Sequence, residues 1–74
     1  MRDFTSAVFN GLPDKILSAS VNSRGHVWLH EVTTDKLHYN ITIGAWIDVN
    51  GDYGIPKGSD YADGAIVAIN RVWL

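Results

Sequence analysis

The fold of this chain is decided by residues 15–32, which read KILSASVNSRGHVWLHEV. Apolar side chains recur at every second position along residues 17–21 and again along residues 27–29. This two-residue period, within the stretches 15–21 and 26–32, is typical of half-buried β-strands. The polar residues 22–25 between them favour a tight turn. The stretch therefore predicts an antiparallel pair of strands.

The register of this pair follows from the turn. A three-residue loop that places Gly25 in the left-handed conformation brings Val21 opposite Val27 and Ala19 opposite Leu29. Paired residues in an antiparallel sheet project from the same face. The register therefore predicts one apolar face that packs on a core and a second, more polar face.

A third strand is predicted farther along the chain. Residues 37–43 show the clearest alternation of the sequence, because every second side chain is apolar. A polar turn at residues 33–36 comes directly before them. We therefore expect a three-stranded antiparallel meander made of residues 15–21, 26–32 and 37–43.

Two helices are expected to flank the meander. A short N-terminal helix is predicted at residues 3–10, where Asp3 is a capping residue type. From Ser59 onward a helical period separates polar from apolar side chains better than a strand period does. The expected fold class is a single α+β domain, residues 1–74, whose C-terminal helix packs on one face of the meander. The alternative is a small all-β barrel with residues 65–74 as a strand.

The composition limits the classes of protein to consider. The chain has 74 residues, of which 46% are apolar and 19% charged, and these values favour one small globular domain. It has no cysteine, which excludes a disulfide framework and a thiolate metal site. Without a long apolar run or a secretory signal, we expect a cytoplasmic protein that does not bind membranes. A net charge of −2 disfavours nucleic acid as a partner. Because so small a core gives modest stability, a homodimer is a further expectation.

A polar and aromatic surface is predicted on the face of the meander that does not carry the core. If both turns have an odd length, the three histidines share this face with a tryptophan. Such residues combine large contact area with directional hydrogen bonds, as protein interfaces do. With two tyrosines expected to be exposed nearby, the predicted binding surface consists of Ser18, Ser20, His26, Trp28, His30, His38, Asn40, Tyr53 and Tyr61. The alternatives are an ordinary solvated face and, with an even second turn, a buried Trp28.

A second candidate site follows the meander. Residues 48–52 read DVNGD and resemble the first half of the calcium loops of EF-hands and dockerin modules. In such loops, side-chain oxygens at alternate positions turn toward one hard cation. The resemblance implies a calcium site made of Asp48, Asn50, Asp52 and Asp60. The alternative is a plain Asn-Gly turn flanked by acidic residues.

Catalysis finds little support in the sequence. It contains no glycine-rich phosphate loop, no nucleophile elbow and no helical His-Glu-His metal motif, so we expect no enzyme. The leading hypothesis is a non-catalytic module that binds another protein. Its size is that of a small phage or mobile-element protein that inhibits a host factor. The alternative is a calcium-dependent or carbohydrate-binding domain that uses the loop of residues 48–60 and exposed aromatic side chains.

Overall fold

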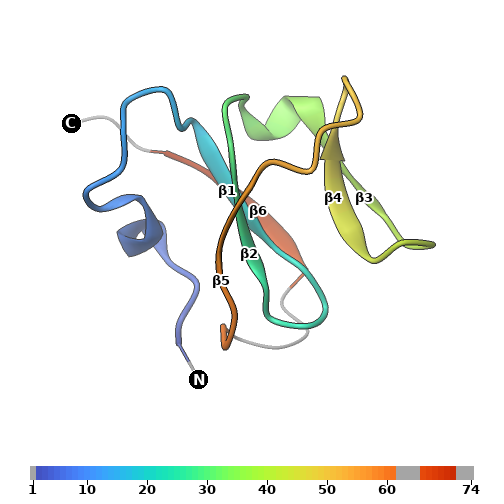
Figure 1. Ribbon diagram of the computed structural model, residues 1–74, viewed down its shortest axis with the longest axis horizontal. Helices are drawn as coiled ribbons and strands as arrows, with labels where there is room; N and C mark the ends of the chain where they lie inside the picture. Colours follow the sequence, from blue (N-terminus) through green and yellow to red (C-terminus); the bar gives the residue numbers. More distant parts are fainter. Residues whose placement is uncertain (1, 62–65, 72–74) are drawn as a thin grey trace.

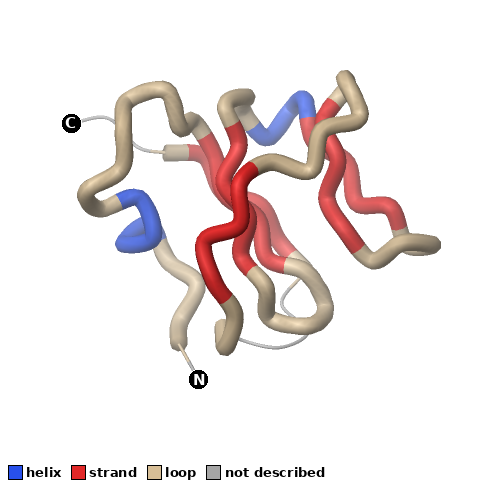
Figure 2. Tube along the Cα trace, viewed as in Figure 1, coloured by secondary structure: helices blue, strands red, loops and turns tan. Residues whose placement is uncertain are grey.

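The computed structural model of the protein describes residues 2–61 and 66–71, which form two antiparallel sheets (Figure 1). The elements in chain order are η1 (Ser6–Phe9), β1 (Ser18–Val21), β2 (Val27–His30), η2 (Thr34–Lys36), β3 (Leu37–Asn40), β4 (Ala45–Asp48), β5 (Ile55–Gly58) and β6 (Val67–Asn70). Four strands form one sheet in the order β5-β2-β1-β6, and β3 and β4 form a separate hairpin. Turns and loops join these short strands (Figure 2).

The predicted hairpin of β1 and β2 is confirmed, and so is its register. Val21 pairs with Val27, as the three-residue loop requires. Gly25 has a φ of 74°, the left-handed conformation that such a loop needs at this position. The buried side chain of Asn22 stabilises the turn, since its Oδ1 accepts hydrogen bonds from the backbone N–H groups of Arg24 at 2.9 Å and His26 at 3.1 Å.

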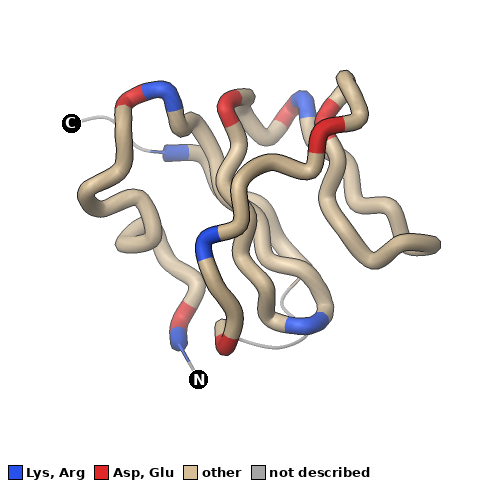
Figure 3. Tube along the Cα trace, viewed as in Figure 1, with Lys and Arg blue, Asp and Glu red and all other residues tan. Residues whose placement is uncertain are grey.

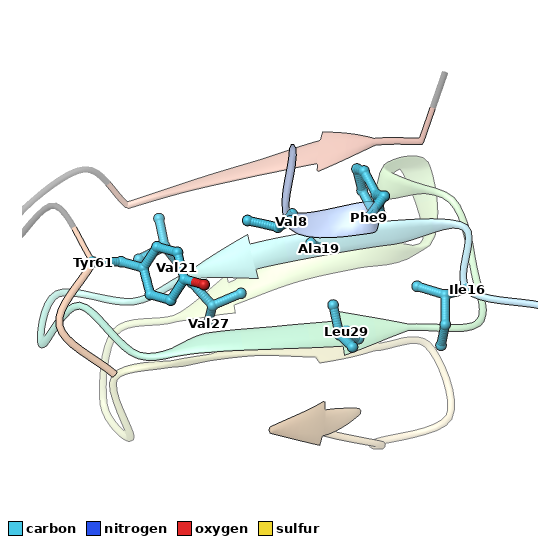
Figure 4. Close-up of a cluster of buried hydrophobic side chains, with 8 residues drawn as sticks. All are labelled: Val8, Phe9, Ile16, Ala19, Val21, Val27, Leu29 and Tyr61. Carbon is cyan, nitrogen blue, oxygen red and sulfur yellow. The ribbon is translucent and has the colours of Figure 1, made fainter. Parts of the chain in front are cut away.

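The main core lies on one face of the four-stranded sheet. Paired residues of β1 and β2 project from this face together. The N-terminal segment with η1 packs over them, and Tyr61 covers one end (Figure 4). The buried apolar side chains are Val8, Phe9, Ile16, Ala19, Val21, Val27, Leu29 and Tyr61. Burial of each of the larger ones contributes roughly 1.5–3 kcal/mol to folding.

The hairpin of β3 and β4 covers the opposite face of this sheet. Tyr39 pairs with Trp46, and their rings pack edge-on with centroids 5.6 Å apart. The indole Nε1 of Trp46 donates a hydrogen bond to the backbone oxygen of Val21 at 3.2 Å. Figure 1 shows the hairpin and the N-terminal segment on opposite sides of the sheet. Because both faces are covered, all four residues of β1 are buried.

The α+β fold class expected from the sequence is wrong. Within the described residues, the helical segments are the short 3-10 turns η1 and η2. The N-terminal segment begins at a cap, where Thr5 Oγ1 accepts from the backbone N–H of Ala7 at 3.3 Å, but it continues for four residues only. A helix this short does not recover the free energy of nucleation, so the segment stays a single turn. Neither turn in this part of the chain is long and apolar enough to cross a membrane.

The prediction of a C-terminal helix is also wrong for the residues that the structure describes in that segment. Residues 67–70 form β6, which pairs with β1 from Val67 opposite Val21 to Asn70 opposite Ser18. Its β-branched residues favour a strand. Pairing with β1 outweighed the preference for a helix that the sequence showed in its separation of polar from apolar side chains. The all-β alternative placed a strand here, but its barrel is wrong because the sheet is open, with β5 and β6 at its edges. Residues 62–65 and 72–74 of the predicted helix lie outside the described residues.

The predicted meander is wrong at its third strand. β3 pairs with β4, whereas the second partner of β2 is β5. The η2 turn between β2 and β3 contacts β6, so the chain passes β1 and reaches the β6 side of the sheet before β3 begins. Alternation indicates which side of a strand is buried, but it carries no information about which strand lies beside it.

We expect Trp46→Phe to lower the free energy of unfolding by about 1–2 kcal/mol. Phenylalanine keeps an aromatic ring against Tyr39 but removes the donor that binds the Val21 oxygen. Urea denaturation at pH 7.5 measures the change. Tyr53→Phe, at an exposed position, is the matched control and should leave the midpoint unchanged. Equal midpoints for both variants would show that the indole bond does not hold the hairpin on the sheet.

Candidate functional site

The candidate site is built on the loop that joins β4 to β5. Asp48, the last residue of β4, organises this loop, because its Oδ1 accepts hydrogen bonds from the backbone N–H groups of Asn50 at 2.8 Å and Asp52 at 3.0 Å. Asp52 continues the pattern by accepting from the N–H of Gly54 at 2.9 Å. The loop is therefore shaped by its own carboxylates, as in the Asx turns that these residue types favour.

A pocket of about 350 Å³ lies between this loop and the end of β2. It is lined by the apolar Leu29, Val32 and Ile55, by Gly54, and by the polar His30, Glu31, Asp48, Asn50 and Asp52. Three of these lining residues carry a carboxylate, and no lining residue is Lys or Arg. Acidic positions accordingly gather on the side of the molecule where the β4–β5 loop lies (Figure 3).

His30 is the most buried polar residue of this pocket, with 2% of its surface exposed. One ring nitrogen, Nε2, lies 2.8 Å from Oγ of Ser20. Burial lowers the pKa of His30 by desolvating the imidazolium, and the carboxylates of Asp48 and Asp52 partly oppose this by favouring the charged ring. The imidazole is therefore mainly neutral at pH 7, and the charge of the pocket is that of its carboxylates.

Gly54 lets the loop approach β2 closely. A Cβ at this position would lie 2.4 Å from the backbone oxygen of Leu29 and 2.8 Å from Nδ1 of His30. Its φ of 90° also belongs to the region that side chains other than that of glycine rarely adopt. The shape of the pocket therefore depends on the absence of a side chain at Gly54.

The nine residues of the predicted binding surface do not form one exposed face. Ser18, Ser20, Trp28 and His30 do project from the same face, but the three polar ones are buried there and Trp28 is half-buried. The hairpin of β3 and β4 covers this face, which the meander was expected to leave open. These four residues are therefore not presented on an open face of the sheet.

The other members of the predicted surface are scattered. The side chains of His26 and His38 are exposed, on the β1–β2 turn and on β3. Asn40 accepts two backbone hydrogen bonds in the β3–β4 turn. Tyr61, expected to be exposed, is buried beside Phe4, with the Arg2 guanidinium over its ring. Of the nine predicted residues, Tyr53 alone is exposed and also next to the pocket, since it lies between the lining residues 52 and 54.

The predicted calcium ligands are not brought together. Asp48, Asn50 and Asp52 line the pocket, but Asp60 lies beyond the far end of β5, where its backbone oxygen accepts from Arg2 at 2.7 Å. Within residues 2–61 and 66–71, no group of three Asp, Glu, His or Cys side chains has a geometry that could hold a metal ion. The structure therefore does not bring the four predicted ligands to one place.

Sequence reasoning did not single out Glu31 and Gly54 as members of this site. Glu31 follows β2 directly, but alternation gave no indication that a loop about 20 residues later in the chain would meet it. Gly54 could be recognised as a turn residue, not as the point at which two backbones approach. The Asp48–Asp52 spacing was the one local signal that pointed to the correct loop.

Comparison with protein-family models, with curated proteins and with solved structures found no match to this chain. The interpretation of the site consequently depends on its own geometry.

We expect the stability of the protein to fall as the pH drops below 6.5, because the pKa of His30 is lowered from 6.5 in the folded state. The unfolded chain takes up a proton that the folded chain resists, so this contribution is complete above pH 6.5 and is lost toward the lower folded pKa. Urea midpoints between pH 7.5 and pH 5.5 measure it. His30→Gln should reduce the pH dependence, whereas His26→Gln, at an exposed ring, should keep it. The same pH dependence in all three chains would contradict this assignment.

Gly54→Ala should destabilise the protein by at least about 2 kcal/mol, because it combines a left-handed backbone with a steric overlap. Gly51→Ala is the matched control, since Gly51 has a φ of 80° but nothing within 4 Å of an added Cβ. The control should lose about 1 kcal/mol from the backbone alone. Thermal and urea unfolding give both values. Equal losses would show that contact with β2 does not require glycine at position 54.

Proposed function

We propose that the chain is a non-catalytic module that binds another protein through the rim and interior of this pocket. The observation that carries the proposal is an acidic pocket whose loop also carries exposed apolar side chains. Val49, Tyr53 and Ile55 lie on or next to the loop and are 67%, 47% and 46% exposed. We call these three residues, together with Glu31, Asp48 and Asp52, the loop surface. Aromatic and aliphatic anchors beside a pocket are typical of protein contacts.

The charge of the pocket indicates the chemistry of the partner. No hydrogen bond within the described residues reaches Oδ2 of Asp48 or of Asp52, so one oxygen of each carboxylate is available to accept from a partner. Glu31 forms one ion pair, with Lys15 at 3.3 Å, but both side chains are largely exposed and such a pair contributes little. A Lys or Arg side chain of a partner would meet several acceptors there, with apolar contacts around it.

The surroundings of Ser20 support a non-catalytic role. Its hydroxyl lies 2.8 Å from His30 Nε2, an arrangement that resembles a nucleophile and its base. However, Ser20 is only 1% exposed and does not line the pocket. The pair is better explained as two buried polar groups that satisfy each other.

The proposed biological setting is that of a small cytoplasmic protein, of phage or mobile-element origin, that blocks a host factor. A blocking protein needs a rigid contact surface rather than a reaction centre. The loop surface suits this, because its backbone is held by hydrogen bonds to Asp48 and Asp52 before a partner arrives.

Binding to arrayed 12-residue peptides tests the proposal. Peptides with a central Lys or Arg between apolar residues should bind better than the same peptides with norleucine or Glu at the centre. The double variant Glu31→Gln/Asp52→Asn should weaken binding at least about tenfold, since charge-assisted hydrogen bonds contribute about 1.5–3 kcal/mol each. Asn at position 52 can still accept from the Gly54 N–H, so the loop is kept.

The matched control is Asp3→Asn/Asp60→Asn, which changes the net charge equally at exposed positions that do not line the pocket. It should leave peptide affinity within about twofold at 0.15 M salt, where distant charges are screened. Equal weakening by both double variants would mean that net charge, and not the pocket, attracts the peptides. Binding of simple sugars with no preference for basic peptides would favour the carbohydrate-binding alternative.

A further inference from the structure

The two edges of the four-stranded sheet are built differently. On the β5 edge, Pro56 lacks a backbone donor, Lys57 carries a charge, and the pairing with β2 shifts register between Val27 and Trp28. These are features by which natural sheets prevent further pairing. The edge strand β6 reads VAIN and has no proline, charge or register shift along its pairing with β1. One edge is protected, and the other has the properties of a strand that can accept a neighbour.

Within the described residues, backbone groups of β6 at this edge have no backbone partner. Arg71 N donates to the oxygen of Leu17 at 2.8 Å, which makes this pair a hydrogen-bonded one. Hydrogen-bonded and non-bonded pairs alternate in an antiparallel ladder, so Ile69 and Val67 also face β1, while Ala68 and Asn70 face outward. Among the described residues, no backbone group binds the outward N–H and C=O groups of Ala68 and Asn70.

We propose that this edge pairs with β6 of a second copy of the chain, in antiparallel orientation and with Ala68 opposite the same residue of the second copy. In this register Val67 lies opposite Ile69 across the junction, so an apolar residue meets an apolar residue on the core face. The backbone groups of Ile66, Ala68 and Asn70 exchange hydrogen bonds between the copies. Pairing of the two edges turns two four-stranded sheets into one continuous sheet.

Three observations select a second copy as the occupant. The register is self-complementary about the two-fold axis that a homodimer has. No charged side chain lies within β6, so two identical edges meet without repulsion although each chain carries a net charge of −2. Ile66 and Val67, at 41% and 43% exposure, would be covered in a chain whose own core is small.

The size of the contact sets its strength. In this register five residues on each side are paired, 66–70, and they bury less than a standard interface of about 1,600 Å², so the dimer is reversible and depends on concentration. The loop surface lies beside β5, at the other edge of the sheet from β6, and stays free in both copies. The dimer therefore does not depend on the proposed peptide binding, but it would present two loop surfaces to one partner.

Cross-linking tests the register directly, because the chain contains no cysteine of its own. Hydrogen-bonded antiparallel pairs have Cα atoms about 5.5 Å apart, within the range of about 4.4–6.8 Å that a disulfide spans. Ala68→Cys should therefore give a disulfide-linked dimer under mild oxidation at low micromolar concentration. Ser23→Cys, in the exposed β1–β2 turn, is the control for random collisions and should stay mainly monomeric.

Sedimentation velocity tests the dimer without cross-linking. The sedimentation coefficient of the unaltered chain should rise with concentration toward that of a dimer. Ala68→Pro removes the outward N–H at a position where an edge strand tolerates proline, so this variant should stay monomeric while its circular dichroism spectrum is retained. A chain that is monomeric up to millimolar concentration, with Ala68→Cys cross-linking no faster than Ser23→Cys, overturns the proposal. A dimer that Ala68→Pro leaves intact while folded overturns it as well.

Discussion

The pairing of β1 with β2, Val21 opposite Val27, is the constraint on which the rest of the structure depends. It places Ala19, Val21, Val27 and Leu29 on one face and Ser18, Ser20, Trp28 and His30 on the other. Both faces are then covered, the first by the N-terminal segment and the second by the β3–β4 hairpin. The polar residues are thereby buried, and they must be satisfied inside the protein.

That requirement explains the bonds beneath the hairpin. Ser18 donates to the backbone oxygen of Val32, and Ser20 shares a hydrogen bond with His30. Throughout the described part of the chain, every buried side-chain nitrogen and oxygen has a partner. A neutral imidazole under an acidic loop follows from this arrangement, since burial disfavours the imidazolium more than the neighbouring carboxylates favour it. The same residue thus serves the packing of the sheet and forms one wall of the pocket.

The two proposed contacts lie at opposite edges of one sheet and differ in physical character. The loop surface offers side chains, namely carboxylates and exposed apolar groups on a backbone fixed by Asx turns. The β6 edge offers backbone donors and acceptors with almost no side-chain chemistry. Specificity for a partner would come from the first kind of surface, because its side chains select the partner. Backbone pairing accepts almost any strand, so it must be limited by residues that prevent it, such as the proline and lysine of β5.

The sequence by itself determined the local structure: the β1–β2 hairpin, its register and its turn, because a two-residue alternation and a left-handed Gly25 involve only neighbouring residues. It also marked the Asp48–Asp52 loop, whose carboxylates bind their own backbone. Only the tertiary structure decided that β3 leaves the sheet, that residues 67–70 join it as a strand, and that Trp28 and His30 face a covering hairpin. Periodicity indicates which face of a strand is buried. Which strand lies at each of its edges depends on long-range packing, and no single segment of the sequence contains that information.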